Sequence, residues 1–224
     1  MNRTTSAGER ILELLPKGLQ VDVLTEVRGP RILTHDFFNA VQQRHVRQFR
    51  MMCHEAFENL QPAPDEWIFM PQDACHQMYF IIAGECRYVP VGRFNHAAGG
   101  GRDSFFVHVM EETLSRHKHL TPQNIAEMPP GQRPDIVPLL AGRWVSEAVL
   151  WTPWEHTGAL ISVRDSMLLT LSDTDFARIM KNYPPAHVSA VLYARQFVAG
   201  LNRFGKTYTD IIELDSLRAN NTND

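Results

Sequence analysis

The stretch from Arg143 to Leu160 concentrates the side chains best suited to hold a small molecule. It contains three of the chain's four tryptophans, together with Glu147 and His156. A carboxylate accepts hydrogen bonds from hydroxyl groups, and a histidine, with a reference pKa of about 6.5, can pair with an anion when it is protonated. Two interpretations stay open here: the tryptophans line a ligand cavity, or they fill that space as ordinary core aromatics.

Other residues with reactive side chains lack the partners that catalysis needs. His117-Lys118-His119 resembles the paired histidines of metal-dependent cupin barrels, but no third ligand stands nearby in the sequence. Cys53-His54 and Cys75-His76 lack the partner spacing of a zinc site. No G-x-S-x-G, P-loop or H-E-x-x-H motif occurs, so the sequence favours a non-enzymatic function. A cupin-type enzyme is a third hypothesis, which metal analysis of the purified chain would test.

Composition indicates a globular chain without a drive toward polyanions. The 224 residues are 44% hydrophobic and 21% charged, which is enough for one large domain, and the net charge of −3 gives no general attraction to nucleic acid. The three cysteines stand far apart, as is typical of a reducing compartment. Neither a signal peptide nor an apolar run of about 20 residues is visible. We therefore expect a soluble, cytoplasmic chain.

Apolar residues at helical spacing predict that the first sixty residues are mostly helix. Leu19, Val23 and Val27 recur every four residues, and Gly29-Pro30 is predicted to end this helix. A second helical stretch begins at Asp36 and is predicted to run to the prolines beyond residue 60. Its apolar stripe consists of Val46, Phe49, Cys53, Phe57 and Leu60.

Short aromatic and β-branched runs then predict the strands of a small barrel or sandwich. Residues 92–142 are rich in glycine and proline and predict a loop-rich insertion, with one helix near residues 105–117, that is either functional or a mobile excursion. From Asp175 onward an apolar stripe predicts closing helices, capped by Gly205. The predicted strands are residues 66–69, 77–82, 85–89, 159–163 and 167–171.

Several motifs along these elements resemble cyclic-nucleotide-binding domains. Residues 64–69 and 78–85 resemble the strand pair of that family, and residues 146–150, Ser-Glu-Ala-Val-Leu, look like the start of its phosphate-binding cassette. Residues 168–176 resemble the last strand and the turn into the final helices. The resemblance covers roughly residues 11–91 and 143–207 and leaves out the insertion.

The flanking segments point to one branch of the family. Residues 15–20 and 35–38 resemble the end of the linker that joins the pore to this domain in hyperpolarization-activated, cyclic-nucleotide-gated and ether-à-go-go-type channels. The resemblance implies an α+β fold, with an antiparallel, jelly-roll-like β-barrel flanked by helices at both ends. It divides the chain into a helical linker segment (1–36), a barrel domain with flanking helices (37–207) and a polar tail (208–224).

The resemblance also assigns roles within the cassette. In the family the phosphate lies at the N-terminus of a short helix, a glutamate accepts the ribose hydroxyl, and an arginine pairs with the phosphate. Here Glu147 takes the glutamate position, the N–H groups of Ala148 and Val149 would face the anion, and Thr157 matches a hydroxyl that touches the base.

Two positions of the cassette depart from the family pattern. Ser146 replaces a glycine, and His156 stands at the arginine position. Losing one partner of a buried ion pair costs roughly 2–5 kcal/mol, which is tens to thousands of times in affinity. Arg164 lies about 26 Å from His156 along the strand, so it cannot take the place of the missing arginine. Arg143 stays an open alternative for that role. His156 either serves as a pH-dependent clamp when protonated or is a polar residue packed among aromatics.

We therefore expect a non-catalytic cytosolic regulatory and assembly module, resembling the C-terminal domain of a voltage-gated or cyclic-nucleotide-type cation (potassium) channel, with a degenerate nucleotide pocket. The expected partners are a channel pore module and sibling subunits in a homotetramer at the cytosolic face of a membrane, with this chain as part of a larger channel. Cyclic AMP or cyclic GMP is expected to bind weakly at most. The alternative is a functional cAMP- or cGMP-binding sensor of channel or kinase regulatory type.

Overall fold

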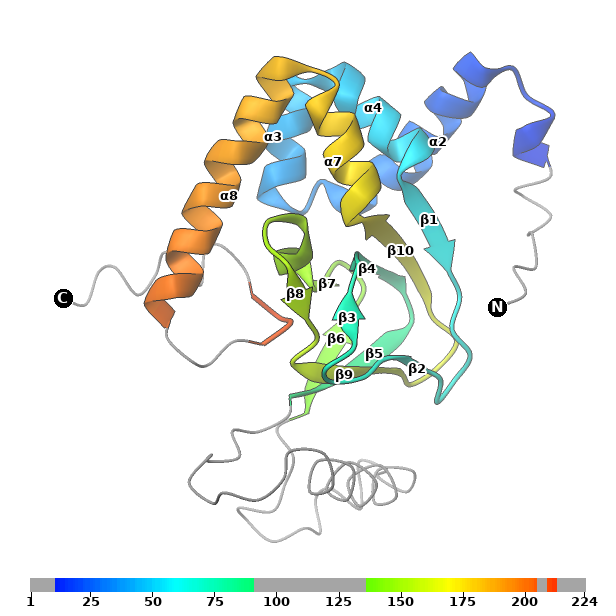
Figure 1. Cartoon of the computed structure of the whole chain (residues 1–224). Helices are drawn as coiled ribbons and strands as arrows, with labels where there is room; N and C mark the ends of the chain where they lie inside the picture. Colours follow the sequence, from blue (N-terminus) through cyan, green and yellow to red (C-terminus); the bar gives the residue numbers. More distant parts are fainter. Residues whose placement is uncertain (1–10, 91–135, 205–208, 213–224) are drawn as a thin grey trace, which may run out of the picture.

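The computed structural model describes residues 11–90, 136–204 and 209–212. Within them, helices gather at one end of the molecule and antiparallel strands at the other, while the last helix runs down one side (Figure 1). The expected α+β class is therefore confirmed. None of the helices in the described ranges combines the length and the apolar character that crossing a bilayer requires. The helical elements are α2 (Lys17–Ile32), α3 (Asp36–Arg44), α4 (Val46–Glu55), the single 3-10 turn η1 (Glu147–Leu150), α7 (Asp173–Lys181) and α8 (Pro184–Phe204).

The strands pair into two four-stranded antiparallel sheets and one two-stranded ribbon. Sheet A has the order β1-β10-β4-β7, sheet B has the order β2-β9-β5-β6, and β3 pairs with β8. The strands of sheet A are β1 (Phe57–Leu60), β10 (Met167–Ser172), β4 (Gln77–Ala83) and β7 (Trp144–Val145). Those of sheet B are β2 (Trp67–Phe69), β9 (Gly158–Ser162), β5 (Glu85–Pro90) and β6 (Val137–Leu140), and the ribbon is β3 (Ala74–Cys75) with β8 (Trp154–Glu155).

Sheet A lies between the helices and sheet B, which explains the continuous apolar run in β4. Met78 and Phe80 belong to the core shared with the helices. Tyr79 and Ile81, which alternate with them along the strand, belong to the core between the two sheets. Successive side chains of a strand point to opposite faces, so a strand buried on both faces has no polar alternation.

Helix α2 continues to Ile32, past the predicted end at Gly29-Pro30. Pro30 removes one helical N–H, yet the chain stays helical, because the Leu33 N–H donates to the Gly29 carbonyl at 3.1 Å. Gly29 is buried because α4 packs there: a Cβ at this position would lie 3.6 Å from the Phe49 ring. The glycine is therefore a close-packing residue rather than a helix stop.

The prediction of one helical stretch from Asp36 to Leu60 is wrong at its end. Helix α3 does begin at Asp36, with the His35 ring accepting from the Phe37 N–H at 3.2 Å as an N-cap, but the chain breaks at His45 and α4 ends at Glu55. Phe57 then enters β1 and pairs with Leu171 of β10. The apolar spacing was compatible with a helix, but the open edge of β10 made a strand the better partner.

Two further segments also differ from expectation. Strand β6 lies within residues 92–142, where a loop-rich insertion was predicted, and pairs with β5. Residues 92–135 of that predicted insertion, including the helix near residues 105–117, lie outside the described ranges. Gly205 lies outside them also. The four described residues of the predicted polar tail, 209–212, pack against the strands rather than extending away (Figure 1).

The five predicted strands are confirmed as β2, β4, β5, β9 and β10.

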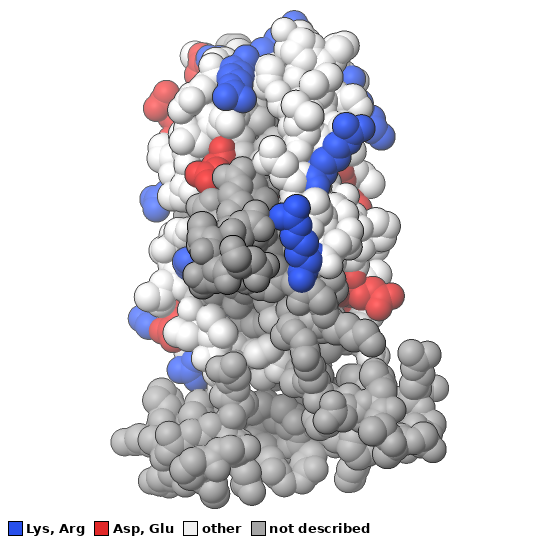
Figure 2. Space-filling model, turned by 90° about the vertical axis from the view of Figure 1, so that its left-hand side faces the viewer, with Lys and Arg blue, Asp and Glu red and all other residues white. Residues whose placement is uncertain are grey.

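The face that carries α8 has no concentrated charge. Figure 2 shows single Lys and Arg side chains spread among uncharged residues, with a few Asp and Glu between them. Helix α8 itself has the sequence PPAHVSAVLYARQFVAGLNRF, which contains two arginines and neither aspartate nor glutamate. Its contacts to the rest of the molecule include the packing of Phe197 and Leu201 and the hydroxyl groups of Ser189 and Tyr193.

Candidate functional site

The C-terminal clasp, defined here as residues 209–212, places one carboxylate inside a ring of hydrogen-bond donors. The Asp210 residue is 2% exposed. Two main-chain bonds hold it: the Ser146 N–H donates to the Asp210 carbonyl at 2.7 Å, and the Asp210 N–H donates to the Tyr88 hydroxyl at 3.0 Å. Ile211 packs on the core between the sheets, and Ile212 packs against the core beneath α8.

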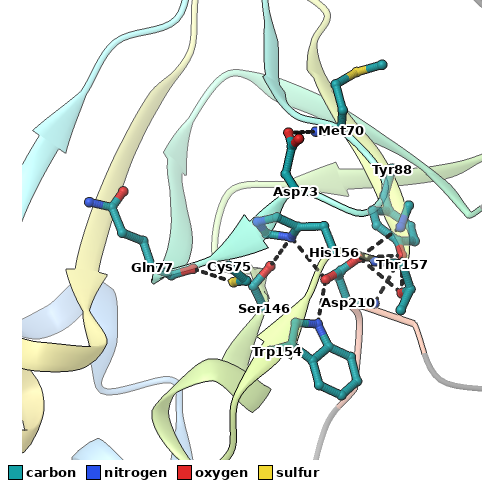
Figure 3. Close-up of polar contacts among 11 residues, drawn as sticks. Met70, Asp73, Cys75, Gln77, Tyr88, Ser146, Trp154, His156, Thr157 and Asp210 are labelled. Atoms are coloured by element: carbon teal, nitrogen blue, oxygen red, sulfur yellow. Dashed lines mark hydrogen bonds and ion pairs between the residues drawn. The ribbon is translucent and has the colours of Figure 1, made fainter.

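Six donors converge on the Asp210 carboxylate, and most of them come from a single short stretch after β8 (Figure 3). Oδ1 accepts from the Trp154 indole at 2.8 Å and from His156 Nδ1 at 3.1 Å. Oδ2 accepts from the Tyr88 hydroxyl and the Thr157 N–H, both at 2.8 Å, and from the Thr157 hydroxyl and the Gly158 N–H, both at 3.1 Å. We name this donor set, Tyr88 with Trp154, His156, Thr157 and Gly158, the clasp pocket.

The donors keep Asp210 ionised despite its burial. Burial alone would raise the pKa of Asp210, but the hydrogen bonds from His156, Trp154 and Tyr88 and the charge of His156 outweigh it and hold that pKa below its ordinary value. Burial, followed by the nearby Asp210 charge, raises the pKa of Tyr88, which keeps its hydroxyl protonated and able to donate. The site is therefore an anion site whose resident anion belongs to the chain itself.

The lowered pKa of Asp210 predicts a stability difference that depends on pH. A carboxyl whose pKa is lower in the folded than in the unfolded state stabilises the fold above its unfolded pKa, and this contribution is lost as pH falls through the folded pKa. We expect the difference in free energy of unfolding between wild type and Asp210→Asn to be constant above about pH 5 and to shrink below about pH 4. Urea denaturation across that range measures it. A difference that grows on acidification would contradict the prediction.

The structure brings Ser146, His156 and Thr157 of the predicted site together around Asp210. The His156 ring stacks on Phe69 with centroids 3.6 Å apart and planes inclined by 8°, so its orientation is fixed. Ser146 is fully buried and has a φ of 64°, a left-handed conformation that favours glycine. The expected glycine position is thus a real backbone requirement, met here by a serine whose hydroxyl lies 3.4 Å from His156 Nδ1.

Val149 does not offer its N–H to the anion cradle that the resemblance implies for Ala148 and Val149. They lie in η1, where the Val149 N–H donates back to the Ser146 carbonyl at 3.3 Å. The Val149 side chain joins the helical core, and Ala148 packs against Phe197 and Leu201 of α8. In this structure the converging N–H groups are those of Thr157 and Gly158, which lie past β8 rather than in the cassette turn.

Glu147 is engaged by the protein on both of its oxygens. Oε1 accepts from the Tyr193 hydroxyl of α8 at 2.9 Å and from the Trp151 indole at 3.2 Å. Oε2 lies 3.1 Å from His35 Nε2; the angle is unsuitable for a hydrogen bond, so this is a close electrostatic contact between side chains that are each 1% exposed. Because His35 Nδ1 accepts from the Phe37 N–H, the ring proton lies on Nε2, facing Glu147.

These contacts form a junction between the start of α3, η1 and α8. We call Glu147 with His35, Trp151 and Tyr193 the Glu147 junction. His35 caps α3, Trp151 follows η1, and Tyr193 belongs to α8, so one carboxylate contacts three separate elements. A ribose hydroxyl could reach Glu147 only by replacing one of these partners.

Removing the junction carboxylate is expected to destabilise the fold. In Glu147→Ala, the Trp151 indole and the Tyr193 hydroxyl lose their acceptor and His35 loses its electrostatic partner. Each unsatisfied group costs about 1–3 kcal/mol, partly relieved by repacking. We expect the free energy of unfolding to fall by about 1–3 kcal/mol in chemical denaturation. Glu155→Ala is the matched control: Glu155 is exposed at the end of β8, and the loss of stability on its substitution is expected to stay within about 0.5 kcal/mol. Equal decreases in the free energy of unfolding of the two variants would contradict the prediction that the Glu147 junction stabilises the fold.

The tryptophans of the opening stretch divide between core and site. Trp144 packs on His35 and Phe80, and Trp151 packs on Phe37, so these two are core aromatics. Trp154 instead donates to Asp210. The core interpretation is therefore confirmed for Trp144 and Trp151, whereas Trp154 faces a carboxylate of the chain itself.

The arginine alternatives do not enter the clasp pocket as donors to Asp210. Arg164 forms an ion pair with Glu85 at the other end of β9, as its distance along the strand predicts. Arg143 is exposed, and its main chain pairs with Ile81 and Leu140. Each of the six donors to Asp210 is an amide, a hydroxyl, an indole or an imidazole, and none is a guanidinium.

Sequence reasoning missed Asp210, Tyr88, His35 and Tyr193. A signal for the first was present: Ile211 and Ile212 are adjacent aliphatic residues just past the end of α8, where a polar tail was expected. Within the described ranges, no group of three or more His, Cys, Asp and Glu side chains is placed to hold a metal ion. His117-Lys118-His119 lies outside those ranges.

Comparison with known proteins adds no assignment. The chain matches no protein-family model and no curated protein. The site's chemistry must therefore carry the functional argument.

Proposed function

We propose that the chain is a non-catalytic regulatory and assembly module of the kind that follows the pore in voltage-gated or cyclic-nucleotide-type cation channels, with its nucleotide pocket closed by its own clasp. The observation that carries the proposal is the Asp210 carboxylate, which takes up six donors. One of them is His156, which stands at the position that the resemblance pairs with the phosphate. A site already satisfied by a covalently attached anion gains little from a free one.

The strand order supports the jelly-roll-like barrel that this proposal requires. Setting aside the short β3–β8 ribbon, the four strands of sheet A are the first, eighth, third and sixth in the chain, and those of sheet B are the second, seventh, fourth and fifth. This alternation between two antiparallel sheets is the connectivity of a double Greek key. The resemblance to cyclic-nucleotide-binding domains thus rests on the connectivity as well as on sequence motifs.

The proposed mechanism is mechanical transmission through α8. The clasp follows the C-terminal end of α8 and binds the barrel, while Tyr193 in the middle of α8 binds the Glu147 junction. His35, at the other side of that junction, caps α3 next to the linker helix α2. Movement of α8 against the barrel would therefore shift the linker helices, which in a channel load the pore. The pore module and sibling subunits, at the cytosolic face of a membrane, are the partners that this mechanism needs.

The alternative function is a working cyclic-nucleotide sensor, and the donor set itself favours it. If the clasp left, the Thr157 and Gly158 N–H groups with His156 would offer a phosphate oxygen the same bonds that Asp210 accepts. Such a sensor would bind cyclic AMP or cyclic GMP in competition with the clasp, and more tightly when His156 is protonated.

Titration calorimetry separates the two functions. With the wild-type chain we expect no saturable heat from cyclic AMP or cyclic GMP at about pH 6 or at about pH 8, because Asp210 holds the donors at both. Saturable binding in the micromolar range at either pH would overturn the proposal and favour the sensor. Binding at about pH 6 alone would identify His156 as the clamp.

A further inference from the structure

We propose that the clasp pocket is a peptide-recognition site, which accepts from a partner protein a non-helical segment containing an aspartate followed by two aliphatic residues. This inference rests on the proposed function, because it takes the clasp to be the resident ligand of a regulatory site. The partner's segment would displace the clasp and so release the end of α8 from the barrel.

The contacts of the clasp are those of a bound peptide rather than of a bound ion. Besides the carboxylate, the site binds the main chain of Asp210 on both sides, through the Ser146 N–H at 2.7 Å and the Tyr88 hydroxyl at 3.0 Å. These two bonds do not depend on the side chain, so they fix the direction and position of any peptide that enters. A free anion such as acetate or phosphate offers neither of them.

The two residues after the aspartate add an apolar requirement. Ile211 packs on the core between the two sheets, and Ile212 packs on the core that contains Ala148, Phe197 and Leu201. Polar residues at these places would lose hydration without gaining a partner. The recognised sequence is therefore an aspartate with two aliphatic residues directly after it.

The donor geometry selects a short carboxylate over a phosphate. Four donors lie within 3.1 Å of Oδ2 and two within 3.1 Å of Oδ1, so a planar pair of oxygens uses the full set. None of these donors is a guanidinium, whose fixed charge and fork geometry suit phosphate. A glutamate would carry its oxygens one methylene further, which the main-chain bonds at Ser146 and Tyr88 do not allow.

The clasp has a kinetic and entropic advantage over a partner because it belongs to the same chain. Only the short stretch of residues 205–208 separates it from the end of α8. A tether this short gives an effective concentration of roughly millimolar. A partner's segment must therefore arrive at high local concentration, as a subunit or a permanently attached protein would provide, to compete.

The test uses the full chain with Asp210→Ala, which vacates the donors, and a fluorescein-labelled peptide of sequence Thr-Asp-Ile-Ile with blocked ends. Fluorescence anisotropy is expected to show saturable binding to the variant, at least about tenfold tighter than to the wild-type chain, where the clasp competes. Peptides in which the aspartate is replaced by asparagine or by glutamate are expected to bind at least about tenfold more weakly. Absence of saturable binding to the variant, or equal binding of the three peptides, would overturn the inference.

The result stays interpretable if the variant is unstable. Should Asp210→Ala be unfolded by circular dichroism, excess Thr-Asp-Ile-Ile peptide is expected to restore the spectrum, and failure to do so would overturn the inference. Dimers of the wild-type chain that Asp210→Ala abolishes would mean that the segment comes from a second copy, and would overturn its assignment to a different protein. Cyclic AMP binding to wild type would instead count against the proposed function, so the two failures are distinguishable.

Discussion

Replacing Asp210 by asparagine is expected to lower the free energy of unfolding by about 3–5 kcal/mol, the usual cost of removing one member of a buried charged network. The asparagine has the same size but carries an NH₂ group in place of one oxygen. That group would face two donors if it replaced Oδ1 and four if it replaced Oδ2. In either orientation the NH₂ group of the amide faces other donors. Because asparagine and aspartate have the same size, the expected loss of stability comes from these unfavourable donor–donor contacts and not from a change of shape.

Chemical denaturation at neutral pH measures this loss, and Asp165→Asn provides the control. Asp165 is exposed in the turn between β9 and β10, and its substitution is expected to change the free energy of unfolding by less than about 0.5 kcal/mol. Similar values for the two variants would show that the six hydrogen bonds contribute no net stability.

The same variant tests whether the clasp communicates with α3 through α8. If α8 carries the coupling, amides of α3 should exchange faster with deuterium in Asp210→Asn than in wild type. Faster exchange confined to the clasp and to the loop after β8 would argue against transmission through α8 and Tyr193.

Gly158→Ala is expected to lower the free energy of unfolding by about 2–4 kcal/mol and to release the clasp at the same time. A Cβ at this position would lie 2.4 Å from Tyr88 Cζ and 2.5 Å from its hydroxyl oxygen, distances that real contacts do not reach. The Tyr88 ring cannot move aside, because it is completely buried between the sheets. Any shift that relieves the overlap moves the hydroxyl that both donates to Asp210 and accepts from it.

Gly18→Ala is the control for the glycine substitution. A Cβ at Gly18 meets no atom within 4 Å, and the residue lies in α2, so the exchange is expected to be neutral or to stabilise by up to about 1 kcal/mol. The tryptophan fluorescence of the Gly158 variant should also differ from that of wild type. The reason is that the Trp154 indole, which donates to Asp210, loses this acceptor when the clasp leaves. A stable variant with unchanged fluorescence would mean that the sheets relax around the methyl group.

The sequence determined the elements whose apolar residues follow one another closely. Strands β4 and β10 are buried on both faces, so their residues are apolar in succession, and a pattern of that kind can be read without knowing its partners. The start of α3 could also be predicted from the sequence, because its cap and its first turn lie within a few residues of each other. Ser146 was recognised as a place for glycine, and its φ of 64° agrees.

Elements that depend on distant partners were decided by the tertiary structure. Phe57 and Leu60 fit a helical stripe, yet they form β1 because β10, more than a hundred residues later, offers a free edge. Strands β3, β7 and β8 have two residues each, too few to carry a period, and exist only through their pairing.

The functional site follows the same division. The sequence alone identified the stretch around Glu147 and His156, because the residue types and their spacing are local. Only the tertiary structure decided that Glu147 faces His35 and Tyr193, and that His156 faces Asp210, residues 54 positions apart. Hydrogen bonds between groups so far apart in the chain leave no period in the sequence, since each end is a single polar residue whose partner is chosen by the fold.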